Sequence, residues 1–270
     1  MRRCRILFVQ FMVAVLLSLS LRTAQAQRSN AVPQEGLLNV TPSAMMAQVE
    51  ALGDRILRSE KGRTAFTGNF VNDRGEAGTL RVTVQLPRAV ALEGLRPNAP
   101  AIVFDGRSSP GPVSKTEGDL LELFSSDTAE GLLAAVKEER AIRLLGRWVR
   151  DVPSNRTETV GPPYDIYEAA VDVPSNPTAP ERLKRYLFDS ETGLLARTEY
   201  LDEAYSPPLK VEVRFSDWQQ IDGSAYPGRI VRLENDHAVF SLSVTRIQSL
   251  PREDPAHFGT AQETGRQEDR

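Results

Sequence analysis

A run of alternating side chains near the C-terminus constrains the fold most. Apolar and polar residues alternate along residues 209–216, so four apolar side chains share one face of an extended chain. The turn-forming segment 217–223 separates this strand from a second β-prone run over 226–233. A third run over 238–247 again places its apolar residues at every second position. The sequence therefore predicts three consecutive antiparallel strands, a β-meander.

Two turn motifs surround this meander. Asp189 opens a D-x-x-T-G-L motif that ends at Leu194, between two β-prone runs. The second motif, S-D-[aromatic]-x-x-[apolar]-D-G-x-x-[aromatic]-P, extends from Ser216 to Pro227. Together they resemble the C-terminal half of the LolA-like proteins, the outer-membrane lipoprotein-sorting family of periplasmic carriers. The resemblance implies an open β half-barrel that holds acyl chains in an apolar cavity.

The rest of the chain contributes further strands and a few helices. A helix is expected over 43–59, after an N-cap at Ser43, and two short helices are expected within 117–137, the second with Asp127 as its N-cap. The expected fold class is α+β, an open antiparallel half-barrel of roughly ten strands with about three helices over its concave face. The strands expected before the meander are 66–71, 80–86, 89–92, 101–104, 142–148, 164–173 and 183–188.

The ends of the chain differ in composition from its middle. Residues 1–26 combine arginines, an apolar run and a final Ala-Gln-Ala, which predicts a cleaved signal peptide and a soluble periplasmic or secreted protein. Residues 27–40 read as a flexible leader, and residues 251–270 as a disordered charged tail. The half-barrel domain is expected over 41–250. Because Cys4 is the single cysteine, the mature chain has no disulfide.

Charge and composition exclude several classes of function. The chain has 33 Lys and Arg against 36 Asp and Glu, and four of the arginines lie within residues 1–26. The acidic mature chain is therefore not expected to bind nucleic acid or to insert stably into a membrane. Of its two histidines, His237 lies at an expected hairpin turn and His257 in the expected tail, so no two-histidine metal site is expected, and no catalytic motif is present. We expect no enzyme activity, no metal and no cofactor.

The apolar faces of the strands are the candidate binding site. An open half-barrel cannot cover its concave face with a second sheet, so these faces pack on helices or line a cavity. Ordinary core packing is the alternative for every one of these residues. The candidate lipid-binding residues are Leu80, Val82, Val84, Leu144, Trp148, Phe188, Val213, Phe215, Phe240 and Leu242.

The resemblance and the lining together suggest a carrier of lipid or lipoprotein acyl chains that works without catalysis. An envelope protein would then load the cargo or receive it. The helices expected over 43–59 and 117–137 are candidates for a lid. Two other classes stay open: a periplasmic sensor or partner-binding envelope domain on the same fold, and an exported enzyme with an unrecognised site.

Overall fold

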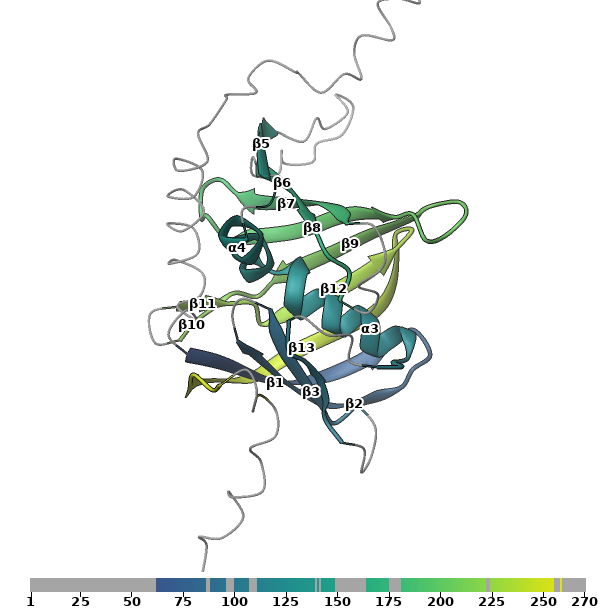
Figure 1. The fold of residues 1–270 in the computed structure, drawn as a ribbon, viewed down its shortest axis with the longest axis vertical. Coiled ribbons are helices and arrows are strands. Elements are labelled where there is room, and N and C mark those ends of the chain that lie inside the picture. Colours follow the sequence, from purple (N-terminus) through teal and green to yellow (C-terminus); the bar gives the residue numbers. More distant parts are fainter. Residues whose placement is uncertain are drawn as a thin grey trace, which may run out of the picture. The chain divides into compact units, whose positions relative to one another are not determined.

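The computed structural model describes residues 62–85, 88–95, 100–106, 111–138, 140, 142–148, 164–174, 181–221, 224–254 and 258. The predicted signal peptide, leader and first helix, residues 1–26, 27–40 and 43–59, lie outside this part of the chain. The described residues all belong to one compact unit. Their fold is a large antiparallel sheet with helices packed on one face (Figure 1).

Eleven of the described strands form a single sheet. Its order is β4-β3-β2-β1-β13-β12-β9-β8-β7-β6-β5, so β4 and β5 lie at opposite ends and the sheet stays open. Every neighbouring pair is antiparallel. The strands are β1 (Gly62–Asn72), β2 (Ala77–Gln85), β3 (Ala89–Glu93), β4 (Ile102–Phe104), β5 (Ile142–Trp148), β6 (Tyr164–Val171), β7 (Arg182–Asp189), β8 (Leu195–Asp202), β9 (Leu209–Ser216), β12 (Arg229–Glu234) and β13 (His237–Pro251).

Short polar side chains set the turns between neighbouring strands. At the β1–β2 hairpin, the Asn72 side chain accepts hydrogen bonds from two backbone N–H groups, and Gly75 takes a positive φ of 76°. At the β7–β8 turn, Asp189 Oδ1 accepts from the N–H of Thr192 at 2.9 Å, and Gly193 has φ 70°. The D-x-x-T-G-L motif is thus a turn that joins adjacent strands, as the sequence predicts.

The meander forms with one change at its middle run. Residues 226–233 do not make a single strand, because Tyr226 ends β11 (Ser224–Tyr226), which pairs with β10 (Gln219–Ile221) in a separate hairpin. Pro227 has no N–H to donate to a ladder. A Cβ on Gly228 would lie 2.5 Å from the carbonyl oxygen of Asp217, so only glycine fits this close approach. Strand β12 therefore begins at Arg229.

Three helical elements follow one another directly and pack on the sheet. They are α3 (Lys115–Glu122), the π-helix η3 (Leu123–Asp127) and α4 (Ala129–Lys137), and we call residues 115–137 the helical plug. A capping box between Ser114 and Glu117 starts α3. The predicted N-cap of the second helix was wrong: Thr128 occupies that position, while Asp127 ends η3 and turns into the interior.

The packed domain extends past residue 250. Pro251 pairs with Gly62 at the end of the β1–β13 ladder, and the N–H of Glu253 donates to the Gln85 side chain at 2.8 Å. Phe258 is buried against the alanines of β3. The described part of the chain contains eleven sheet strands, a small hairpin and two α-helices joined by a π-helix. The predicted fold class, an α+β open half-barrel, is confirmed.

Candidate functional site

The predicted lining residues converge on the helical plug. Eight of them are buried in one hydrophobic cluster with the plug, and Leu144 packs against that cluster while half-buried. Trp148 ends β5, but its side chain lies outside the described part. The eight buried residues are Leu80, Val82, Val84, Phe188, Val213, Phe215, Phe240 and Leu242.

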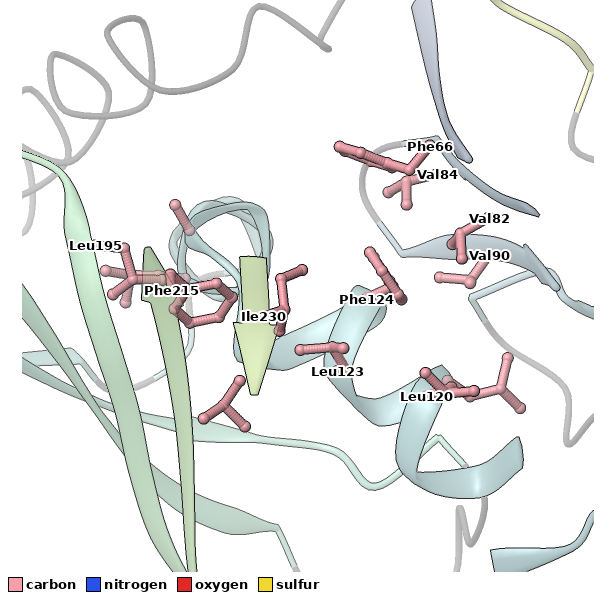
Figure 2. Close-up of a cluster of buried hydrophobic side chains, with 14 of the residues drawn as sticks. Phe66, Val82, Val84, Val90, Leu120, Leu123, Phe124, Leu195, Phe215 and Ile230 are labelled. Atoms are coloured by element: carbon pink, nitrogen blue, oxygen red, sulfur yellow. The ribbon is translucent and has the colours of Figure 1, made fainter. Parts of the chain in front are cut away.

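The plug lies between two halves of the sheet. Figure 2 shows Leu123 and Phe124 between Phe215, on one side, and Val82 and Val84 on the other. The Phe124 ring lies 5.8 Å from the ring of Phe66, centroid to centroid. These contacts are core packing in this conformation, so the plug occupies the concave face where a cavity was expected.

A small cavity remains beside the start of α4. Its volume is about 20 Å³, room for roughly one water molecule. Apolar side chains from the sheet and the plug form most of its wall, with Trp218 at the edge of the hydrophobic cluster. Its lining residues are Phe66, Val84, Phe124, Thr128, Ala129, Glu130, Leu195, Phe215, Trp218, Pro227 and Ile230. Val84 and Phe215 are the predicted site residues that reach it.

A buried ionic cluster fixes the plug to the sheet. Lys184, on β7, is fully buried and donates to Glu122 Oε1 at 2.8 Å and to Ser126 Oγ at 2.8 Å. It also pairs with Asp127, which is equally buried. The Asp127 carbonyl oxygen accepts from the hydroxyl of Thr198 at 2.7 Å. The last residue of α3 and the C-terminal end of η3 are thus bonded to strands β7 and β8.

Two arginines complete this cluster. Arg182 pairs with Glu122, and its Nη2 lies 2.8 Å from Asp202. Arg232, on β12, is 1% exposed, and its Nη2 lies 3.1 Å from Asp119 Oδ1. We call Asp119, Glu122, Asp127, Arg182, Lys184 and Arg232 the ionic cluster. Because three carboxylates of α3 and η3 meet three cations of the sheet, this half of the plug is anchored.

The cluster controls how its carboxyl groups ionise. Burial alone would raise the pKa of Glu122, but Lys184, Arg182 and Arg232 outweigh it and lower the pKa to about 2. Burial raises the pKa of Asp127, against the attraction of Lys184. Glu122 is therefore the carboxylate that stays ionised most firmly, with Lys184 between it and Asp127.

Sequence patterning missed the ionic cluster. Side chains at every second position of β7 face the plug, so a strand that buries Phe188 also buries Tyr186 and Lys184 and leaves Arg182 half-buried on the same side. The outward Leu183 is 54% exposed. The detectable signal was two cations at every second position before Phe188, together with acidic residues in and beside the apolar run 120–124.

A larger, mixed groove lies at the other end of the plug. It has a volume of about 500 Å³ and extends between the β1–β2 hairpin and the start of α3. Arg74, Glu76 and Thr79 line it from the hairpin and are exposed. Across the described ranges, no group of three metal-ligating side chains occurs, and no helix is long and apolar enough to cross a membrane.

Comparisons with known proteins identify solved structures with a similar fold. No family model and no curated protein matches the sequence. Among solved structures, a LolA superfamily protein from Nitrosomonas europaea has a TM-score of 0.51 at 12% identity and aligns over 79% of this chain and 96% of its own. A putative outer membrane lipoprotein-sorting protein domain from Vibrio parahaemolyticus has a TM-score of 0.50 at 10% identity, over 80% and 96%.

These likenesses agree with the open sheet and its helical plug. The chain is an α+β half-barrel protein. More specifically, it has the LolA-like fold, which confirms the resemblance drawn from the turn motifs at the level of the fold.

Proposed function

We propose that this protein is an exported, soluble periplasmic carrier that holds the acyl chain of a lipid or lipoprotein on its concave face. The observation that supports this most is the plug itself. It covers the apolar side of an open sheet with its own apolar side chains, which an acyl chain could replace without exposing the sheet to water. An envelope protein would load or receive the cargo.

The energies allow such an exchange. An acyl chain of ~16 carbons gains up to ~12 kcal/mol on burial, at ~0.8 kcal/mol per methylene, before ordering costs are subtracted. When the plug lifts, its own apolar side chains are exposed to water. The net free energy of binding is therefore the gain from burying the acyl chain minus the loss from exposing the plug, and these two quantities are similar in size. Reversible loading and release suit a carrier, because neither state is far more stable than the other.

The ionic cluster indicates which part of the plug moves. It anchors α3 and η3 through Asp119, Glu122 and Asp127. The small cavity lies just beyond this anchor, beside Thr128 and Ala129 at the start of α4. We therefore assign the movement to α4, with α3 and η3 held against the sheet.

Native mass spectrometry tests the proposal. The mature chain, residues 27–270, should be purified from the periplasm without detergent, and bound material should be extracted into organic solvent. We expect added mass that extracts as phospholipid or as an acylated peptide. A bare protein that also fails to bind N-phenyl-1-naphthylamine, a neutral apolar fluorophore, would contradict the proposal and assign the apolar faces to core packing alone.

A further inference from the structure

One acidic side chain in the small cavity is left without a partner. Glu130 lies in the first turn of α4, is 4% exposed and lines the cavity. Its Oε2 has no hydrogen-bond partner among the residues that the structure describes. A buried polar atom in this state costs free energy, and the cost is greater for a charged group. Such a group in a cavity wall marks a place where a ligand atom fits.

A second free polar atom lies next to it. The hydroxyl oxygen of Thr128 is buried and lines the same cavity, and it accepts no hydrogen bond from a described residue, while its O–H acts on the Glu130 carboxyl. Although Thr128 is the N-cap residue of α4, its side chain does not bond to the helix backbone. One carboxyl oxygen and one hydroxyl oxygen are thus available as hydrogen-bond acceptors in the wall of an otherwise apolar cavity.

The charges around Glu130 differ from those in the ionic cluster. No lysine or arginine lines the cavity among the residues that the structure describes, whereas Glu122 and Asp127 share two cations, Lys184 and Arg232. Burial raises the pKa of the Glu130 carboxyl, although its own backbone N–H and the nearby Thr128 hydroxyl act in the opposite direction. A role in complementing the helix dipole alone would not require burial, since an exposed first-turn glutamate does the same.

We propose that Glu130 and Thr128 bind the ammonium head of an apolar chain, so that the preferred ligand is a long-chain amine. The ammonium donates one hydrogen bond to Glu130 Oε2 and a second to Thr128 Oγ, and its charge compensates the carboxylate. The chain extends past Phe124 and Phe215 into the space that α4 vacates. A fatty acid of the same length brings a second negative charge and binds more weakly. This inference rests on the proposed function.

The test compares three ligands that differ only in their head group. Decylamine, decanol and decanoate are titrated into the mature chain bearing Trp148→Phe, so that Trp218 at the cavity is the single fluorescent tryptophan. We expect decylamine to bind at least about tenfold more tightly than decanol, and decanoate to bind more weakly than decanol. In Glu130→Gln the preference for decylamine over decanol should disappear.

The matched control is Glu191→Gln, which removes an exposed carboxylate from the β7–β8 turn and should keep the preference. Circular dichroism establishes that each variant is folded. A preference for decylamine that persists in Glu130→Gln, or decanoate binding as tight as decylamine binding, would overturn the amine assignment and leave the carrier proposal standing. If none of the three chains changes the Trp218 fluorescence, both the carrier proposal and this inference fail.

Discussion

Replacing Lys184 with methionine is expected to lower the free energy of unfolding by about 3–5 kcal/mol, as is typical when one partner of a buried ion pair is removed. Methionine keeps the length of the side chain but not its charge. Glu122 retains Arg182 as a partner, whereas Asp127, which is fully buried, keeps only Arg232 at 3.6 Å. Urea denaturation at neutral pH measures the change.

Lys210→Met is the matched control, because Lys210 pairs with Asp236 at 2.9 Å on the surface. Exposed pairs contribute about 0–1 kcal/mol, so this variant should unfold almost like the parent. The double variant Lys184→Met with Asp127→Asn should recover part of the loss, since it removes the orphaned charge. Equal losses in Lys184→Met and Lys210→Met would show that the ionic cluster does not anchor the plug.

Phe124→Ala should cost a similar amount, about 3–5 kcal/mol, for a different reason. Phe124 is 3% exposed, packs on Phe66 and forms part of the cavity wall. Its loss enlarges an apolar cavity, and such cavities take up apolar molecules. The variant should therefore be less stable than the parent but bind decanol more tightly, as measured by urea denaturation and by Trp218 fluorescence.

Phe240→Ala separates these two effects. Phe240 is also 3% exposed and packs on another ring, that of Phe70 at 5.6 Å, but it does not line the cavity beside α4. It should lose comparable stability with no gain in decanol binding. If Phe124→Ala binds decanol no more tightly than Phe240→Ala does, the cavity is not the point of entry for the chain.

Local patterns predicted much of this fold. The alternation over residues 209–216 corresponds to β9, and the Asn72 and Asp189 turns lie where their side chains can bond to the backbone. The long-range pairing was not predictable from these patterns. Strand β1 pairs with β13, near the other end of the domain, and Phe66 lies opposite Ile247. Alternation identifies the apolar side of a strand, but it does not identify the strand that lies next to it.

The candidate site was predictable only in its apolar part. Alternation correctly placed Val84 and Phe215 on the inner face, but it could not show that the plug fills the space above them. It also missed Lys184 and Arg232, because a lysine or arginine in a strand is usually exposed. These cations are buried only because carboxylates of the plug meet them, and that complementarity arises between distant segments.

Hydrogen exchange with and without a bound chain tests the central claim most directly, namely that α4 lifts while α3 and η3 stay anchored. Mass spectrometry of peptides from the mature chain, alone and saturated with decanol, gives the exchange rate of each element. We predict faster exchange over α4 (Ala129–Lys137) in the bound state, and unchanged exchange over α3 (Lys115–Glu122) and over β7 and β12. Slower or unchanged exchange over α4, with decanol bound, would mean that the chain occupies a rigid site and that the plug is not displaced.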